Sequence, residues 1–473
     1  MNGYDLTDHS LSARTMTEPS RIQSVLIFSF FLIFQYLLVR SFGLDDLAPL
    51  LEHHWQLIDI VALEKAPFSS LLYIHTQPPL FNFIVGLLAQ LPFNLYDSLV
   101  VLNCLCGTVI TLLLYLIASH LLKSRVIGFV VALLYASAPS ALLYAGYPFY
   151  PTLTSLGYAL YVYSLFIAHA NFRKSVIFLV LSIIYLTLLR SSMSLPHALV
   201  FIGIYLFYTR ARKLTYKAIL VLLLCSLAPL LALQAKNLIL YGFFGSTSWA
   251  PLNLVKGAGI DIYPNHFPSP EQLLELYPNT TCDHHYVDID TSLKKSTGAP
   301  NYNSCYFLSF AQGHRATLFT HYRLMPHVYR MISHLGQYIA LPDTYIYLSN
   351  RKKIESYANF YNLAFLPVVP RVNYEIRLSL ILLCTFTLLF AIKQKDIFIL
   401  NIFAIFFIHM ASYVLTDGDE SKRFVFEIEF IFYIFAAYLM SLIRKKYCQK
   451  PLGDDDGSSA GHSTKQSLKT TSQ

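Results

Sequence analysis

Two adjacent carboxylates stand at the edge of the first apolar run of this sequence. Asp45 and Asp46 follow that run in the stretch GLDD. A carboxylate held between water and lipid can serve as a general base or as a ligand for a cation. Aspartate is also a common cap at the start of a helix. On the residues alone, helix capping is the stronger interpretation of this pair.

A second polar group stands where another apolar segment begins. His75 and Gln77 precede a Pro-Pro pair in the stretch IHTQPPLFN. Proline is tolerated in the first turn of a helix, because its missing N–H would have no partner there. Histidine can change protonation near neutral pH, and glutamine both donates and accepts hydrogen bonds. The stretch therefore predicts either a capped interfacial helix or part of a site.

Three cationic residues stand beside or within apolar segments. Arg190 is surrounded by apolar residues, where an arginine indicates a function or a buried partner unless it snorkels to the interface. Lys422 and Arg423 end the polar loop TDGDESKR, which also contains Glu420. A guanidinium suits an anionic headgroup because it presents several donors in one plane. The loop could equally be a solvated hairpin.

The remaining polar residues include possible metal ligands and a possible disulfide. The neighbouring His53 and His54 diverge by about 100° on a helix and have no further ligands at suitable spacing, so they predict no zinc site. No cofactor is indicated with certainty, although a divalent cation at the external carboxylates stays open. Cys282 and Cys305 share the one long polar stretch and could form a disulfide if that stretch is extracytoplasmic.

The composition indicates the class of protein that holds these residues. Hydrophobic residues make up 55% of the 473 residues and charged residues only 13%, whereas soluble domains carry roughly 25% charged residues. Long apolar runs recur, which predicts an all-α polytopic membrane protein. The net charge of +8 comes from short Lys/Arg clusters between the runs. This is typical of cytoplasmic loops rather than of nucleic-acid binding.

The apolar runs and the charge clusters predict an order of segments. The segment 79–93 is shorter than the roughly 20 residues that a spanning helix needs, and residues 46–63 are expected to lie as a helix on the membrane surface. We expect a cytoplasmic N-terminal segment (1–21), a transmembrane domain (22–445) with a first external loop (40–78) and a long external loop (241–373), and a disordered cytoplasmic tail (446–473). Spans are predicted near 22–39, 98–122, 126–145, 150–170, 175–190, 195–209, 216–240, 374–392, 396–415 and 424–443.

Several short stretches resemble the GT-C superfamily of membrane glycosyltransferases. The most similar branch contains the protein O-mannosyltransferases and the bacterial aminoarabinose–lipid A transferases. That superfamily has an acidic residue or pair in its first external loop and a His-Pro-Pro-Leu type element after it; here Thr76 and Gln77 separate His75 from the prolines. The stretches that carry the resemblance are GLDD (43–46), HTQPPLFNFIVG (75–86), LLRSSMSLPHALV (188–200), KNLILYGFFGSTSWAPLNLVKG (236–257) and GDESKRFVFEIEFIFYI (418–434).

The resemblance implies a fold and a reaction. The fold would be a GT-C-type bundle of roughly ten to twelve helices with external juxtamembrane helices. The reaction would move a sugar from a polyprenyl-phosphate donor, such as dolichyl phosphate mannose, to a lipid, glycan or protein acceptor outside the bacterial inner membrane or in the endoplasmic reticulum lumen. The implied roles are catalysis by Asp45 or Asp46, donor-phosphate binding by Arg190, Arg423 and Lys422, and substrate positioning by His75, Gln77 and Glu420.

Two other classes of function compete with this reading. A transporter or flippase for lipid-linked sugars would place ionisable residues near the membrane midplane on broken helices, often in repeated halves. A scaffold subunit of a glycosylation complex would tolerate loss of the acidic pair. Charged residues gather at one face of the predicted topology and no internal repeat is visible, which favours the glycosyltransferase.

Overall fold

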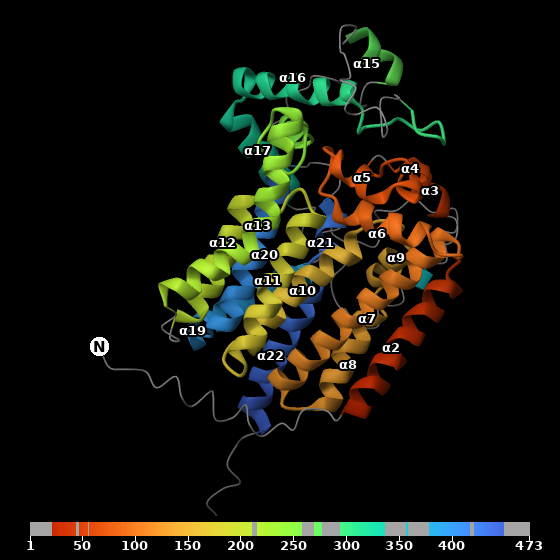
Figure 1. Cartoon of the computed structure of the whole chain (residues 1–473). Helices are drawn as coiled ribbons and strands as arrows, with labels where there is room; N and C mark the ends of the chain where they lie inside the picture. Colours follow the sequence, from red (N-terminus) through yellow and green to blue (C-terminus); the bar gives the residue numbers. More distant parts are fainter. Residues whose placement is uncertain are drawn as a thin grey trace, which may run out of the picture.

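The computed structural model describes residues 21–43, 47–54, 56–210, 215–257, 269–276, 294–335, 356–357, 378–416 and 421–448. Within these ranges the regular elements are helices, and β pairing is limited to one isolated bridge between Lys294 and Pro300. Figure 1 shows a bundle of long helices with shorter helices gathered at one end. The prediction of an all-α fold is confirmed.

The long helices coincide with the predicted spans. Four of the described helices are long and apolar enough to cross a membrane, namely Ile22–Ser41, Leu95–Leu122, Phe172–Leu189 and Tyr216–Tyr241. Ten to twelve crossings stay a prediction. The bundle helices are α2 (Arg21–Ser41), α7 (Leu95–Leu122), α8 (Arg125–Ala136), α9 (Pro139–Gly146), α10 (Pro151–Ile167), α11 (Phe172–Leu189), α12 (Leu195–Tyr208), α13 (Tyr216–Tyr241), α19 (Leu378–Gln394), α20 (Ile397–Thr416), α21 (Ser421–Phe426) and α22 (Phe430–Cys448).

Two predicted spans are broken helices rather than continuous ones. The run 126–145 forms α8 and α9, which are bent by 52° where Pro139 begins the second helix. Proline cannot donate the hydrogen bond that would continue the first helix. The run 424–443 forms the end of α21 and most of α22, and residues 427–429 between them form a turn. Neither predicted span is therefore one continuous helix.

Small and hydroxylated residues hold the first helix against the bundle. Gln35 of α2 bonds Thr108 and Thr111 of α7. A Cβ at Gly107 would come within 2.9 Å of the Gln35 amide oxygen, so a larger residue there would require the Gln35 side chain to shift. Close packing of small residues and interhelical hydrogen bonds hold helices together in lipid, because the hydrophobic effect contributes little to helix association there.

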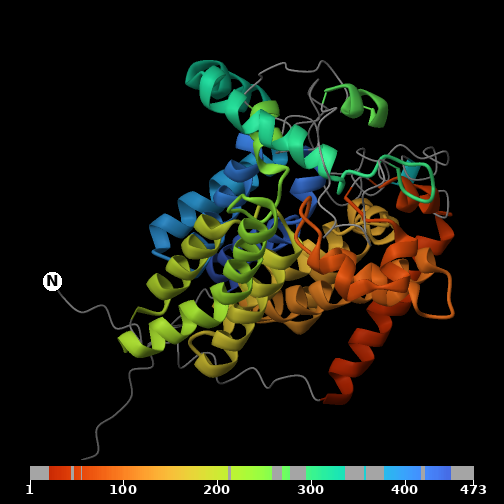
Figure 2. The ribbon, with the colours of Figure 1, turned by 45° about the horizontal axis from the view of Figure 1, so that its top comes forward.

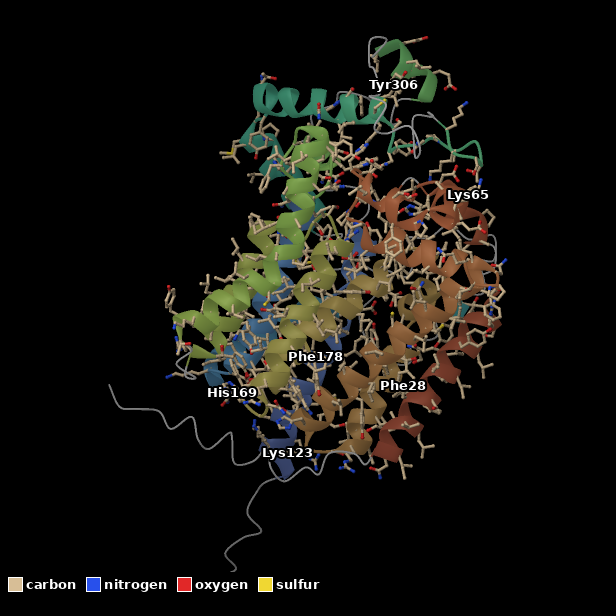
Figure 3. The ribbon with its side chains drawn as sticks, viewed as in Figure 1. Phe28, Lys65, Lys123, His169, Phe178 and Tyr306 are labelled. Atoms are coloured by element: carbon tan, nitrogen blue, oxygen red, sulfur yellow. The ribbon has the colours of Figure 1, made fainter. Side chains whose placement is uncertain are left out.

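The short helices form a layer at the end of the bundle that the sequence predicts to be external, and we call it the external layer. The first external loop carries α3 (Ala48–His53), α4 (Ile60–Lys65) and α5 (Pro67–Leu72), and α6 (Leu80–Ala89) follows it. The long loop carries α14 (Ala250–Gly257), α15 (Pro270–Leu276), α16 (Cys305–His321) and α17 (Leu324–Leu335). Both groups lie at the same end of the bundle (Figure 2). In Figure 3, Lys65 and Tyr306 lie at that end, whereas Lys123 and His169, from predicted cytoplasmic segments, lie at the opposite end.

The first external loop is folded into the protein. Residues 46–63 do not form the single surface helix that was expected, because the chain leaves the helix between α3 and α4. Leu47, Leu51 and Ile58 are buried in a core cluster with residues of α7, α9 and α10. The ten-residue α6 extends about 15 Å, half the thickness of the hydrocarbon core, in line with the prediction that segment 79–93 is too short to span comfortably.

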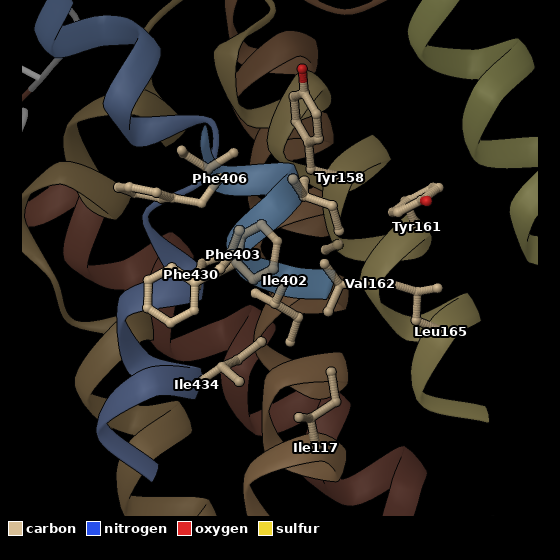
Figure 4. Packing of buried hydrophobic residues seen from close by; sticks show 14 of the residues in the cluster. Ile117, Tyr158, Tyr161, Val162, Leu165, Ile402, Phe403, Phe406, Phe430 and Ile434 are labelled. Atoms are coloured by element: carbon tan, nitrogen blue, oxygen red, sulfur yellow. The ribbon is translucent and has the colours of Figure 1, made fainter. Parts of the chain in front are cut away.

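A larger apolar core fills the other half of the bundle. Residues far apart in the chain meet in it, which fixes the last helices against the middle ones. Figure 4 shows part of this cluster, with Ile117 of α7, Tyr158 of α10, Ile402 of α20 and Phe430 of α22.

Candidate functional site

His75 connects the two external loops. Its Nδ1 lies 2.9 Å from the Ser248 hydroxyl and its Nε2 lies 2.9 Å from the backbone carbonyl of Asn303. A carbonyl only accepts hydrogen bonds, so Nε2 carries the proton and Nδ1 accepts from Ser248. The ring is buried and both nitrogens are occupied. These contacts use His75 to hold the long loop, and a role in positioning substrate stays a prediction.

Asn303 completes this connection from the side of the long loop. Its Oδ1 accepts from the backbone N–H of His75 at 3.0 Å, and its Nδ2 donates to the Tyr73 carbonyl at 3.2 Å. The Thr247 hydroxyl donates to the Thr76 carbonyl, and Ser248 N–H donates to the His75 carbonyl at 2.8 Å. We call this set of contacts, between residues 73–76 and residues 247–248 and 303, the loop connection. No pattern in the sequence pointed to Asn303.

The two residues that separate His75 from the prolines are buried beside the loop connection. Thr76 takes part through its carbonyl, its N–H and its hydroxyl. Gln77 is buried as well, and its Oε1 has no hydrogen-bond partner within the described part of the chain. Thr76, one of the two residues that separate His75 from the prolines, is therefore the residue that hydrogen-bonds to Thr247 and Asn303.

The loop connection should weaken in acid. Burial lowers the pKa of His75 from its ordinary value of 6.5 to about 3. Between these values an unfolded histidine binds a proton that the folded one excludes, so stability falls as the pH drops below 6.5, by at most about 1.4 kcal/mol per pH unit. Limited proteolysis of the long loop across this range measures the effect. His75→Gln, which can still donate and accept, should flatten the pH dependence; an unchanged slope would show that another group controls it.

The long loop is held at a second place. Lys295 Nζ donates to the His54 carbonyl at 2.7 Å. The carboxylate of Asp59 caps α4 and accepts from the N–H and hydroxyl of Ser296 at 2.6 and 2.8 Å. Together with the loop connection, these contacts fix the segment around residues 294–304 over the first external loop.

Arg190 lies beneath this layer, in the break between α11 and α12. Its Nη2 is 3.0 Å from Glu427 Oε1, and the two side chains are 4% and 0% exposed. Nε and Nη2 donate to the Tyr413 hydroxyl at 3.0 and 2.8 Å, and Nη1 donates to the Tyr150 hydroxyl. Tyr413 donates in turn to Glu427 Oε2 at 3.2 Å. Every guanidinium nitrogen therefore has a partner within the protein.

Aromatic rings and a further histidine enclose this ion pair. The guanidinium carbon lies 4.7 Å from the Tyr150 ring centroid and 4.9 Å from that of Phe424. His409 Nε2 donates to the Phe424 carbonyl at 2.9 Å and lies 4.0 Å from Glu427 Oε2. A buried charge is tolerated only when it is paired in this way. Donor-phosphate binding by Arg190 stays a prediction, and a phosphate there would have to replace Glu427 or the tyrosine hydroxyls.

Glu427 is the principal residue that sequence reasoning missed. It stands in the stretch FEIEF, where two acids interrupt an apolar run. Placing a charged carboxylate in lipid costs free energy, as it does for the guanidinium of Arg190. Searching for an acidic partner to Arg190 would have found this stretch.

Aromatic contacts join the external layer to the buried ion pair. The His54 ring stacks on Phe149 with 3.7 Å between centroids, and Phe81 of α6 meets Tyr150 edge to face at 5.4 Å. Tyr150 then accepts from Arg190. The first external loop thus reaches the ion pair through one layer of aromatic side chains.

Several predicted site residues lie outside the described residues. These are Asp45, Asp46, Glu420 and Cys282. Lys422 and Arg423 belong to α21, but their side chains are not among those described. The described residues nearest to Asp45 and Asp46 are Gly43, which has a φ of 62° two residues past the end of α2, and the buried Leu47. The catalytic, phosphate-binding and positioning roles of these residues stay predictions.

Cys305, at the start of α16, is disulfide-bonded. Cys104, Cys106, Cys225 and Cys384 are free, so the partner is Cys282 or Cys448, of which only Cys282 shares the long loop. We expect both Cys282 and Cys305 to resist alkylation in native membranes and to react after reduction, as peptide mass spectrometry would report. Alkylation of Cys282 without reduction would contradict this pairing.

No group of three or more His, Cys, Asp or Glu side chains that could hold a metal ion occurs among the described residues. The chain matches no protein-family model, no curated protein and no solved structure. The several long apolar helices identify a membrane protein of all-α class. Its activity is a matter for proposal.

Proposed function

We propose that the chain is a membrane glycosyltransferase that transfers a sugar from a polyprenyl-phosphate donor to an acceptor at the external face. The sugar and the acceptor, whether a lipid, a glycan or a protein, are left open. The proposal rests on the resemblance of short stretches to GT-C enzymes and on the arrangement of the external loops.

The observation that supports the proposal most is the joining of the two external loops over the bundle. The segment that carries His75 is bound on one side by Ser248 and Asn303 of the long loop. On the other side, Phe81 of α6, which follows this segment, contacts Tyr150, and Tyr150 contacts Arg190. A transferase acting on a lipid-linked donor needs a covered, poorly hydrated space at the membrane boundary, where fixed charges act strongly.

The proposal assigns the following roles. Asp45 or Asp46 removes the proton from the acceptor hydroxyl as it attacks the anomeric carbon, and the bond from that carbon to the donor phosphate breaks. Arg423 and Lys422 neutralise the departing polyprenyl phosphate, and Glu420 and Gln77 position the substrates. His75 acts as a positioning residue through the loop connection. The contacts of Arg190 favour a role in holding the helix breaks together, with direct phosphate contact as the alternative.

A deletion experiment tests the function in the cell. Loss of the gene should cause a polyprenyl-phosphate sugar to accumulate together with an acceptor that lacks one sugar. The wild-type chain should reverse both changes, and the double variant Asp45→Asn with Asp46→Asn should reverse neither. Rescue by the double variant would point to a scaffold role instead.

Arg423 provides a separate prediction. Arg423→Ala should raise the KM for the donor lipid more than it lowers protein abundance, because a guanidinium at the phosphate contributes binding energy but little packing. Arg423→Lys should recover part of the loss, since it keeps the charge. Initial rates at varied donor concentration, normalised to chain abundance, measure this. An equal fall in activity and abundance would indicate a structural arginine.

One observation favours the alternative of a flippase for lipid-linked sugars. Arg190 and Glu427 both lie where helices are interrupted, and transporters build their binding sites from such broken helices. A flippase would move the donor lipid across the bilayer without cleaving it. Analysis of the donor after incubation therefore separates the two functions.

A further inference from the structure

Helix α17 carries a group of large apolar side chains that nothing in the described protein covers. Leu324 is 62%, Met325 76% and Tyr329 77% exposed, and Tyr322 just before the helix is also exposed. Within the helix, Met325 and Tyr329 stand at i and i+4, which places them on one side of it. We call these two residues, with Tyr322 and Leu324, the α17 patch.

The opposite side of α17 faces the protein. His327 is 3% exposed, and its Nδ1 lies 3.0 Å from the Tyr322 hydroxyl. The helix contacts α20 of the bundle and α14 of the long loop. Because α17 packs on a bundle helix, its exposed side lies next to the surface of the bundle.

The surface of the bundle is an apolar shell. On α13 the exposed residues include Leu231, Leu238 and Ile239, and Phe244 follows just past the end of that helix. Helix α13 is long and apolar enough to cross a membrane, and exposed apolar side chains on such a helix face lipid. Figure 1 places α17 beneath α16, at the height of the outer turns of α13. The α17 patch thus lies where the lipid-facing surface meets the external layer.

The chemistry of the patch suits the interfacial region of a bilayer. Tyrosine is enriched where a membrane meets water, since its ring is apolar and its hydroxyl is polar. Arg323, next to the patch, is exposed and can reach lipid phosphates. We propose that α17 is an interfacial helix that inserts the α17 patch into the outer leaflet and so anchors the long external loop to the bilayer. This proposal rests on the membrane location of the bundle and not on the proposed reaction.

Tryptophan fluorescence in nanodiscs that hold one full-length chain each tests this proposal. Tyr329→Trp adds an indole within the patch, and subtraction of the parent spectrum removes the two native tryptophans. We expect lipids brominated in the upper part of the acyl chain to quench the added emission and aqueous iodide to leave it largely unquenched. Met325→Trp gives a second reporter in case the first variant folds poorly. Tyr306→Trp on α16 is the matched control, because Tyr306 lies on the side of the external layer away from the bundle (Figure 3).

Each outcome decides the matter. Quenching by brominated lipid at 329 or 325 but not at 306 supports the proposal. Quenching by iodide at 329 and 325, with no effect of brominated lipid, overturns it. A third outcome is that iodide quenches the emission in nanodiscs that hold one chain but not in proteoliposomes with a high density of protein. That result would mean that a second copy of the chain covers the patch, and it would also overturn the proposal.

Discussion

Glu427→Ala is expected to remove most of the folded protein. The substitution leaves the Arg190 guanidinium buried without its counter-charge, and breaking a buried pair by removing one partner costs about 3–5 kcal/mol. This is a large part of the total stability of an ordinary domain. The yield of monodisperse protein and the midpoint of thermal unfolding in detergent measure the effect.

Two controls separate this effect from a general sensitivity to charge removal. The exposed pair of Glu271 with Lys294, 2.8 Å apart, should matter little, so Glu271→Ala should leave the unfolding midpoint nearly unchanged. The double variant Arg190→Met with Glu427→Leu should be more stable than either single variant, because it leaves no unpaired charge. If the Glu427→Ala variant unfolds at the same temperature midpoint as the parent protein, the structural role of the pair is contradicted.

Replacing both Asp45 and Asp46 by asparagine is expected to lower the rate of sugar transfer by about 10²–10⁴-fold, which is the usual contribution of a positioned general base. Asparagine keeps the size and the capping ability of aspartate but cannot take the proton. Chain abundance should therefore stay close to that of the parent. Initial rates of transfer in membranes, for the two single variants and the double variant, measure the effect.

The single variants identify which of the two acids acts. A loss in only one of them assigns the base to that residue, and we favour Asp45. Glu52→Gln, in the same external loop, serves as the matched control and should transfer at the parental rate. Full activity in the double variant would remove both residues from the mechanism.

The sequence predicted the order of the helices well, because that order depends on long apolar runs. Helices α2, α7 and α13 begin and end within about three residues of the predicted spans. Local residues fix these ends, as where Asn94 caps α7 and Gly242 at φ 72° ends α13. Such signals lie next to the elements they end, so they are visible in a linear sequence.

The breaks and the long-range partners could not be predicted in the same way. The turn between α21 and α22 brings Glu427 to Arg190, and these residues are more than two hundred positions apart. Hydropathy treats the run 424–443 as one span because it does not register a buried counter-charge. Likewise, His75 looked like a residue able to bind substrate, because only the fold brings Ser248 and Asn303 to its ring.

The structure therefore changes which polar residues are expected to have structural roles. His75 and Arg190 hold the external layer and the helix breaks in place through contacts within the protein. Under the proposed function, the chemistry would fall to Asp45 and Asp46, which follow the first apolar run, and to Arg423 of α21. Positioning by a rigid surrounding structure is what a reaction at a membrane boundary requires.

The fate of the donor lipid tests the central claim most directly. The purified full-length chain is reconstituted in liposomes that contain a polyprenyl-phosphate sugar labelled in the sugar, together with a membrane extract that supplies acceptors. The account predicts that label leaves the donor and appears on an acceptor, that free polyprenyl phosphate forms in equal amount, and that Asp45→Asn with Asp46→Asn abolishes both changes. Movement of intact donor to the opposite leaflet, with no cleavage of the sugar–phosphate bond, would contradict it.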